Sequence, residues 1–379
     1  MTWKRLFSKA FAADPDRLHF AAHSHHLWPD VSFDGQIQAW QDAAALADHK
    51  WDKVMGPVWN EAQGHVAREL NLPDPATIAF SSNTHDFILR IVSALPRRPV
   101  RVLSTDGEFH SFRRQMARWI ESGDVILEMA APSDLLAMAQ RGGHDLIFAS
   151  QVLFNSGAIL DCIDGLAALA RPDGPWVVID GYHGFMAVPT DLSALATSIF
   201  YLAGGYKYAM AGEGVCFLHA PPGFAPRPPN TGWYAEFEDL ALPAGAVGYA
   251  GDGRRFLGST FDPSGLYRFN AVQRMLATEG MTTSKVSNHV THLQQHFLSA
   301  DPLPMMTLLN PVTGDPHARF LAFRGDAAMA VHDALNARNV MTDVRGNVLR
   351  IGFAAYHDEA DIDRLLHIVT MALNNDKKG

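Results

Sequence analysis

Two polar residues with complementary chemistry follow apolar runs in the sequence. Asp180 comes directly after the run 176–179, and Lys207 lies a few residues beyond the next run, 199–202, in a glycine-rich stretch. The carboxyl ends of parallel strands meet at one edge of a sheet, so both side chains should emerge there. Pyridoxal phosphate (PLP) chemistry needs a lysine that binds an aldehyde and a carboxylate that keeps a pyridine nitrogen protonated. The sequence therefore predicts a PLP site in which Lys207 carries the cofactor as a Schiff base and Asp180 holds the ring nitrogen.

The hydrophobic pattern predicts the sheet that brings these two residues together. Short runs rich in β-branched and aromatic residues alternate with helical stretches, which is typical of a largely parallel sheet covered by helices. The uninterrupted apolar run 176–179 suits a strand that is buried on both faces. The predicted strands are residues 77–80, 100–104, 125–129, 146–149, 176–179, 199–202 and 215–218. The fold class that follows is α/β, with a mainly parallel seven-stranded sheet in the large domain.

The chain length and the loop signals divide the sequence into parts. A chain of 379 residues favours one large and one smaller domain. Helices are predicted at 34–50 and 57–70, and proline- and glycine-rich stretches between 221 and 258 interrupt the pattern. The elements beyond them indicate an α+β domain, with helices or strands at 265–279, 284–298, 319–323, 327–337, 348–353 and 359–373. We predict an N-terminal segment (1–33), a large cofactor-binding domain (34–260) and a small C-terminal domain (261–379).

The charge and hydrophobic composition argue against nucleic-acid and membrane partners. The sequence holds 31 Lys and Arg against 40 Asp and Glu, a net charge of −9, and it has no basic run that could neutralise a phosphate backbone. No stretch approaches the roughly 20 apolar residues of a membrane span, and the first residues do not read as a signal peptide. We therefore expect no nucleic-acid or membrane partner and a cytoplasmic enzyme with a small-molecule substrate.

The cysteines and histidines of the sequence do not form a recognisable metal-binding pattern. The two cysteines, Cys162 and Cys216, can form no disulfide framework and lack metal-ligand spacing. His19, His23, His25 and His26 cluster near the N-terminus, but no carboxylate or cysteine set completes a site with them. We therefore expect no metal.

The segments around the Asp and Lys carry a specific resemblance. The stretch from Asp180 to His183 reads Asp-Gly-Tyr-His, and residues 204–214 read Gly-Gly-Tyr-Lys-Tyr-Ala-Met-Ala-Gly-Glu-Gly. Both resemble the class V aminotransferase family of PLP-dependent enzymes and, within it, the kynureninase branch. The resemblance covers nearly the whole chain in order. It implies the fold type I architecture and places His183 beside the cofactor or the Asp carboxylate.

The resemblance also implies cofactor contacts elsewhere in the chain. Residues 81–84 lie between a predicted strand and a helix, where free backbone N–H groups and hydroxyls can hold a phosphate. In the family this turn is the phosphate cup, and the residue before the lysine also reaches the phosphate. Another aromatic residue stacks on the cofactor ring, and the 151–157 stretch supplies a polar contact. The phosphate cup here is Ser82, Asn83 and Thr84, and the residue before the lysine is Tyr206. The stacking aromatic residue is Phe109, and the polar residue of the stretch 151–157 is Asn155.

Substrate and subunit contacts follow from the same resemblance. Residues 258–260 resemble the family segment that reaches the phosphate from the neighbouring subunit, which implies a homodimer with shared active sites through Ser259 and Thr260. Arg350 resembles the arginine that binds the substrate α-carboxylate as a bidentate fork. The segment 18–29 is similar to the kynureninase entry strand, which assigns Ser24 and His25 to the pocket mouth. Trp233 would form part of an aromatic wall for the substrate.

The resemblance identifies cofactor and fold more closely than reaction. Transamination needs Lys207 to shuttle a proton, whereas kynureninase-like hydrolysis of a Cβ–Cγ bond also needs an activated water and polarising Tyr or His residues. A catalytically silent PLP or amino-acid binding protein is a third interpretation, which the intact Asp180 and Lys207 disfavour. Desulfuration is not expected because the predicted small domain contains no cysteine. A nicotinamide dehydrogenase is not expected because residues 81–85 are not a glycine-rich turn.

Overall fold

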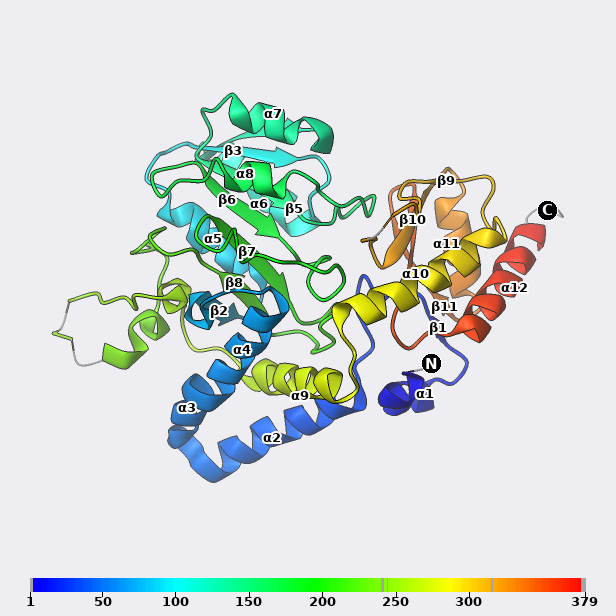
Figure 1. Ribbon diagram of the computed structural model, residues 1–379, viewed down its shortest axis with the longest axis horizontal. Coiled ribbons are helices and arrows are strands. Elements are labelled where there is room, and N and C mark those ends of the chain that lie inside the picture. Colours follow the sequence, from blue (N-terminus) through cyan, green and yellow to red (C-terminus); the bar gives the residue numbers. More distant parts are fainter. Residues whose placement is uncertain (1–2, 240–241, 244, 315, 376–379) are drawn as a thin grey trace.

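In the computed structural model the chain forms a large seven-stranded sheet surrounded by helices, with a smaller sheet and its helices beside it (Figure 1). The structure describes residues 3–239, 242–243, 245–314 and 316–375. Within these ranges no helix is both long and apolar enough to cross a membrane.

The large sheet has the strand order β2-β8-β7-β6-β5-β3-β4. Every neighbouring pair from β7 to β4 is parallel, which confirms the predicted mainly parallel sheet. All residues of β5, β6 and β7 are buried, as their apolar runs require of strands covered on both faces. The strand bounds are β2 (Ile78–Ser81), β3 (Val100–Thr105), β4 (Val125–Ala130), β5 (Leu146–Ser150), β6 (Trp176–Asp180), β7 (Ile199–Gly204) and β8 (Cys216–His219).

Strand β8 is the exception to the parallel arrangement. It runs antiparallel to both of its neighbours, and Cys216 at its start pairs with Ser81 on one side and Gly204 on the other. The beginning of β8 therefore lies at the same edge of the sheet as the ends of β2, β5, β6 and β7. Polar residues that follow any of these strands are thereby brought together.

Helices pack against the sheet and against one another. The helices α4, α5, α6, α7 and α8 contact strands of the large sheet, while α9 packs on α2 and α4. Gly35 of α2 allows this approach, because a Cβ there would lie 2.8 Å from the carbonyl oxygen of Tyr267 in α9. The bounds are α1 (Ser8–Ala13), α2 (Asp30–Leu46), α3 (Lys50–Lys53), α4 (Trp59–Glu69), α5 (Thr84–Ala94), α6 (His110–Glu121), α7 (Leu135–Gln140), α8 (Ile163–Ala167) and α9 (Ser264–Thr278).

The C-terminal part is an α+β unit, as predicted. Its antiparallel sheet has the order β12-β13-β10-β9, and α10, α11 and α12 pack beside it. The bounds are β9 (Thr307–Leu308), β10 (Phe320–Arg324), β11 (Val340–Met341), β12 (Asp343–Arg345), β13 (Val348–Gly352), α10 (Thr283–Ser299), α11 (Ala328–Asn336) and α12 (Glu359–Asn375).

The N-terminal segment joins this C-terminal unit. Strand β1 (Leu18–His19) pairs in parallel with β11, and Ala21 forms a bridge with Gly352 at the end of β13. Short runs of two residues carry too little hydrophobic pattern to be predicted as strands, so this link is not evident in the sequence. The division at residues 33 and 260 stays a prediction.

Candidate active site

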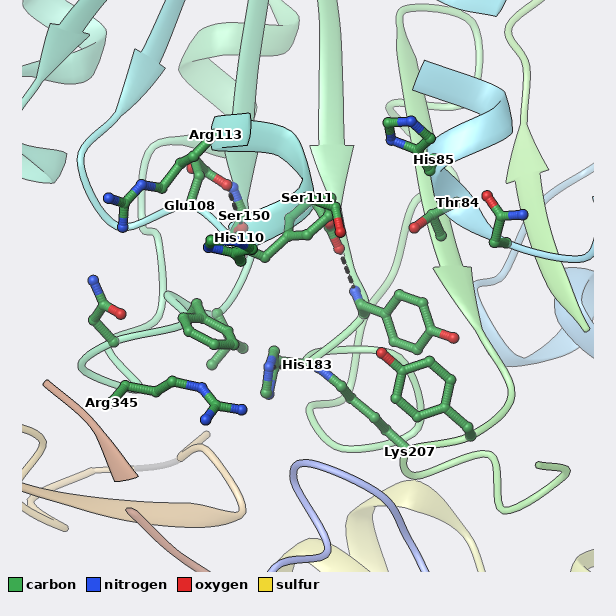
Figure 2. Close-up of a pocket in the computed structure, with 18 of the residues that line it drawn as sticks. Thr84, His85, Glu108, His110, Ser111, Arg113, Ser150, His183, Lys207 and Arg345 are labelled. Atoms are coloured by element: carbon green, nitrogen blue, oxygen red, sulfur yellow. Dashed lines mark hydrogen bonds between the residues drawn. The ribbon is translucent and has the colours of Figure 1, made fainter. Parts of the chain in front are cut away.

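A cavity of about 1000 Å³ opens at the carboxyl edge of the large sheet (Figure 2). Its wall combines the start of α5, the loops after β3, β5, β6 and β7, and the β12–β13 hairpin of the C-terminal unit. Nine of the residues that the sequence analysis assigned to the site line it: Ser82, Asn83, Thr84, Phe109, Asn155, Asp180, His183, Tyr206 and Lys207.

Lys207 lines this cavity with its amine. Its side chain is buried, and Nζ lies 2.6 Å from Nε2 of His183. The ring of Tyr182 is 5.0 Å from the same nitrogen. Burial lowers the pKa of Lys207, and the charge of Arg350 adds to the effect although Asp180 opposes it. The amine therefore reaches its neutral, nucleophilic form at a lower pH than an exposed lysine.

Asp180 ends strand β6 and is also buried. Its Oδ1 accepts a hydrogen bond of 2.8 Å from the backbone N–H of Tyr182. Among the described residues, Oδ2 accepts no hydrogen bond. Burial raises the pKa of Asp180, while the Tyr182 N–H and the charge of Lys207 lower it. A buried carboxylate with an open oxygen can receive a proton-bearing ring nitrogen.

His183 connects the lysine to the rest of the wall. Burial, followed by the charge of Lys207, holds the pKa of His183 well below its usual range, so the imidazole is neutral near neutral pH. Its Nδ1 is buried and has no hydrogen-bond partner among the described residues. A buried, unpaired polar atom at a cavity wall calls for a polar group in the cavity.

The turn before α5 supplies the features that an anion needs. Asn83 is the N-cap of this helix, and its Oδ1 accepts a hydrogen bond of 2.9 Å from the backbone N–H of Asp86. Ser82, Asn83 and Thr84 all line the cavity, so the N-terminal end of the helix faces it. Free N–H groups and the helix dipole favour a phosphate at such a position.

Glu108 is a residue of the cavity wall that the sequence analysis did not assign to the site. It lines the cavity and is buried, with hydrogen bonds from the hydroxyl of Thr105 (2.6 Å) and from Oγ and the backbone N–H of Ser150 (2.5 and 3.1 Å). Burial raises the pKa of Glu108 to about 7. Ser150 pairs in register with Asp180, so Glu108 anchors the strand beside the aspartate. The sequence feature that could have indicated this residue is its position directly before Phe109.

Arg350 does not line the cavity. Its side chain is 1% exposed, its Nη1 donates a hydrogen bond of 2.8 Å to the carbonyl of Phe154, and its Nη2 contacts Asp343. Arg345, which the sequence analysis did not select, lines the cavity instead. The two arginines lie on the two strands of one hairpin, and the sequence alone does not reveal which of them faces the opening.

Five further predicted residues lie beyond the cavity lining, namely Ser24, His25, Trp233, Ser259 and Thr260. Ser259 and Thr260 line a separate cavity of about 270 Å³, which shares Ser82 with the main one. Trp233 donates a hydrogen bond of 3.1 Å from Nε1 to Thr260 Oγ1.

Ser24 and His25 sit beside the loop that carries the lysine. The His25 ring stacks on Tyr206 with centroids 4.9 Å apart, and Ser24 Oγ lies 3.3 Å from His25 Nδ1. Over the described ranges, no group of three or more His, Cys, Asp or Glu residues is placed to hold a metal ion.

The residues of the main cavity fit PLP. A buried lysine amine suits its aldehyde, the open oxygen of Asp180 suits its pyridine nitrogen, and the start of α5 suits its phosphate. The unpaired Nδ1 of His183 and the face of Phe109 offer a polar and an apolar contact to the ring.

Comparisons with known proteins agree with this fit. Residues 284–369 match the family described as kynureninase C-terminal domain. Isopenicillin N epimerase from Streptomyces clavuligerus is 28% identical over 360 residues, which cover 85% of this chain and 86% of the relative.

Among solved structures, an apo cysteine desulfurase from Thermococcus onnurineus NA1 superposes with a TM-score of 0.80 at 16% identity, covering 99% of this chain and 100% of its own. A cystine C–S lyase in complex with cysteine persulfide superposes with a TM-score of 0.79 at 18% identity. This superposition covers 95% of this chain and 98% of the lyase chain. At these identities the likeness shows the fold, which is the predicted fold type I architecture. The chain is therefore similar over most of its length to isopenicillin N epimerase and shares the fold of the cysteine desulfurase, and its residues 284–369 match the kynureninase C-terminal domain family.

Proposed function

We propose that this protein is a PLP-dependent enzyme that acts on an amino acid, of the class V aminotransferase or kynureninase type. The observation that carries the proposal is the buried Lys207 amine, 2.6 Å from His183 in the cavity that Asp180 also lines. A solved structure of the cystine lyase named above has glycine covalently linked to a PLP cofactor, which supports the same choice of cofactor.

The residues divide the work of holding the cofactor. Lys207 would bind its aldehyde, Asp180 its ring nitrogen and Phe109 one face of its ring. Ser82, Asn83, Thr84 and Tyr206 would hold the phosphate, and Asn155 and His183 would contact polar atoms of the ring. When bound, PLP withdraws electrons from the α-carbon of an amino acid, which makes the α-proton removable.

Lys207 and His183 would move that proton. The Lys207 amine, with a pKa lowered by burial, takes the proton at Nζ, and the neutral His183 imidazole accepts a hydrogen bond from it at Nε2. Return of the proton to a different atom gives transamination, and return to the opposite face of the α-carbon gives epimerisation. Transamination needs no further side chain, and we take it as the first candidate.

Kynureninase-like hydrolysis is the second candidate. The match of residues 284–369 to the kynureninase C-terminal domain favours it. Tyr206 and Tyr182, whose ring centroids are 4.7 Å apart, line the cavity near the lysine and could polarise a side-chain ketone. A silent binding protein would bind PLP and amino acids without turnover.

We further propose a homodimer. Ser259 and Thr260 line a cavity other than that of their own lysine, which is compatible with their contributing to the phosphate site of a second subunit. The substrate-binding roles of Ser24, His25 and Trp233 likewise belong to this proposal.

Replacement of Lys207 or Asp180 tests the cofactor assignment. The wild-type protein with PLP should show a visible absorption band near roughly 420 nm that borohydride removes, with the cofactor fixed to Lys207 by mass spectrometry. Lys207→Ala should lose the band, and Asp180→Ala should weaken PLP binding and remove nearly all activity. The exposed Lys285→Ala is the matched control and should behave as wild type. A colourless wild-type protein in excess PLP would refute the assignment.

Product analysis distinguishes the reactions. L-Kynurenine and a panel of L-amino acids are incubated with the loaded enzyme. A 2-oxo acid indicates transamination, the D-isomer indicates epimerisation, and alanine from L-kynurenine indicates hydrolysis. A spectrum perturbed by amino acids with no product over long incubation would favour the silent binding protein.

A further inference from the structure

We propose that the substrate is a dicarboxylic amino acid, and that Arg113 and Arg324 bind the carboxylate at the end of its side chain. This second carboxylate would lie at the part of the cavity that is farther from the lysine. The inference rests on the proposed function, because it names the class of amino acid that the same site would accept.

The wall of the cavity carries unpaired positive charge in a chain whose net charge is −9. Three arginines line it, namely Arg113, Arg324 and Arg345. Arg345 has an internal partner, since its Nη1 lies 2.9 Å from Oδ1 of Asp343. Arg113 and Arg324 are exposed, and neither guanidinium has a hydrogen-bond or ion-pair partner among the described residues. Unpaired cations on the wall of a cavity concentrate anionic ligands there.

The acidic residues of the cavity wall are engaged elsewhere. Glu108 accepts hydrogen bonds from the backbone N–H and Oγ of Ser150, and Asp180 is buried at the end of β6. Oε1 of Glu213 lies 3.7 Å from Nε2 of His25. A ligand carboxylate at Arg113 or Arg324 would therefore displace no acidic side chain of the described part of the chain.

The register of the small sheet places Arg324 on the face that carries Arg350. Ala322 of β10 pairs with Arg350 of β13, and Arg324 pairs with Val348. Directly paired residues project to the same face of a sheet, and so do residues two apart along a strand. Arg324 therefore lies on the same face as Arg350 and about 7 Å farther along the strands, toward the turn of the β12–β13 hairpin.

Arg113 approaches the cavity from the large sheet. It lies in the first turn of α6, after His110 and Ser111, which also line the cavity. In Figure 2 its guanidinium extends away from Lys207, and it lies on the opposite side of the view from Thr84 at the proposed phosphate end. Arg113 is therefore placed for a group of the substrate and not for the phosphate of the cofactor.

Distance from the lysine separates these two arginines from those of the hairpin. The charges of Arg350 and Arg345 are among the main effects that lower the pKa of Lys207. Arg113 and Arg324 are not among those effects, which agrees with a greater distance from the amine. The carboxylate next to the substrate amine suits the hairpin arginines. A side-chain carboxylate, several carbon atoms away from the amine, suits the outer pair.

Spectral titration of the PLP-loaded protein tests the inference. L-Glutamate and L-α-aminoadipate are compared with L-glutamine, which has the shape of glutamate but an uncharged side chain. The wild-type protein should bind at least one of the two dicarboxylic amino acids about 5- to 10-fold more tightly than L-glutamine, as expected of two partly solvated ion pairs. Raising the ionic strength should narrow this difference.

Variants of the two arginines locate the effect. Arg113→Gln and Arg324→Gln should each reduce the preference for the dicarboxylic amino acids, and the double variant should remove it. The affinity for L-glutamine should stay unchanged in all three. Arg114→Gln is the matched control, because Arg114 is exposed on the same helix but does not line the cavity. It should behave as wild type.

The outcomes separate this inference from the proposed function. A wild-type protein that does not bind PLP refutes the proposed function. A loaded wild-type protein that binds L-glutamine or L-kynurenine, whose side chains are uncharged, at least as tightly as the dicarboxylic amino acids overturns the inference alone. A preference for dicarboxylic amino acids that persists in the double variant would overturn the role of Arg113 and Arg324.

Discussion

Burial determines the charge of the carboxyl groups around the candidate site. Glu108 is enclosed with its oxygens bonded to Thr105 and Ser150, and Asp180 lies in register with Ser150 on the next strand. Burial raises the pKa of Glu108 to about 7, and the charge of Asp180 adds to this rise, so a proton on Glu108 removes a like charge from beside Asp180. In the proposed function, this would favour Asp180 as the partner of a protonated ring nitrogen.

Substitution of Glu108 should change the pH dependence of stability. The folded-state pKa of Glu108 is raised from 4.5 to about 7, so its contribution to stability is present at low pH and is lost as the pH rises through this interval. Glu108→Gln keeps the shape without the ionisation. From pH 4 to 8 the wild-type protein should lose on the order of 3 kcal/mol of unfolding free energy relative to the variant.

Denaturant unfolding of the cofactor-free proteins across this pH range measures the difference. Glu121→Gln, at an exposed position of α6, is the control and should follow wild type. Parallel pH profiles for wild type and Glu108→Gln would contradict the assignment of a raised pKa.

At this scale the sequence was informative where a residue follows a buried strand. Asp180 and Lys207 could be predicted to meet because both lie beyond apolar runs of one parallel sheet. Arg350 and Arg345 could not be told apart, although Arg350 pairs with Asp343 across the hairpin and is buried, whereas Arg345 pairs with Asp343 within β12 and is half exposed. Side-chain pairing between strands leaves no periodic signal in the sequence.

At the scale of the secondary-structure elements, the start of α5 forms the proposed phosphate end of the site. Helix α5 begins at Thr84 directly after β2, and Asn83 caps it. The cap fixes the first turn, so the backbone N–H groups that would hold a phosphate are oriented before any ligand arrives.

Loss of this cap should affect stability and cofactor binding together. Asn83→Ala should lower the unfolding free energy by about 1 kcal/mol and weaken PLP binding, whereas Asn83→Ser should retain most of both. Thr282, whose side chain accepts from the backbone N–H of Lys285 at the start of α10, is the matched control. Thr282→Ala should lose similar stability with unchanged PLP affinity. Equal PLP affinity in both alanine variants would argue against a phosphate at α5.

Element positions were predictable and element directions were less so. The apolar runs located all seven strands of the large sheet to within one or two residues at each end. The antiparallel course of β8 was not predicted, since a short apolar run reads the same in either direction. It depends on the long-range pairing of β8 with β2 and β7.

On the scale of the whole molecule, the N-terminal segment joins the two parts of the chain. It pairs with the C-terminal unit through β1 and Ala21, and the backbone N–H of His26 donates to the Tyr206 carbonyl beside the lysine. The segment therefore contacts both the C-terminal hairpin and the lysine loop. This contact depends on a close approach of His23 to Gly352.

Adding a methyl group at Gly352 should disturb that junction. A Cβ there would lie 2.2 Å from Nδ1 of His23 and 3.0 Å from its backbone nitrogen. Gly352→Ala should lower stability by roughly 1–3 kcal/mol, as overpacked interiors do. His23→Ala in the same chain should restore part of this loss.

Gly64 of α4 is the control, because no atom lies within 4 Å of its added Cβ. Gly64→Ala should leave the protein as stable or stabilise it by roughly 0.5–1 kcal/mol. Thermal unfolding of the four proteins provides the comparison. A Gly352→Ala variant as stable as wild type would show that the junction is loose.

The position of β8 between β7 and β2 also has a consequence for synthesis on the ribosome. Strand β2 leaves the ribosome early, but its partner in the large sheet spans Cys216–His219. Pairing of strands so distant in sequence is slow, because the intervening chain must be ordered first. The turn that precedes α5 can therefore gain the support of β8 only after more than half of the chain has been made.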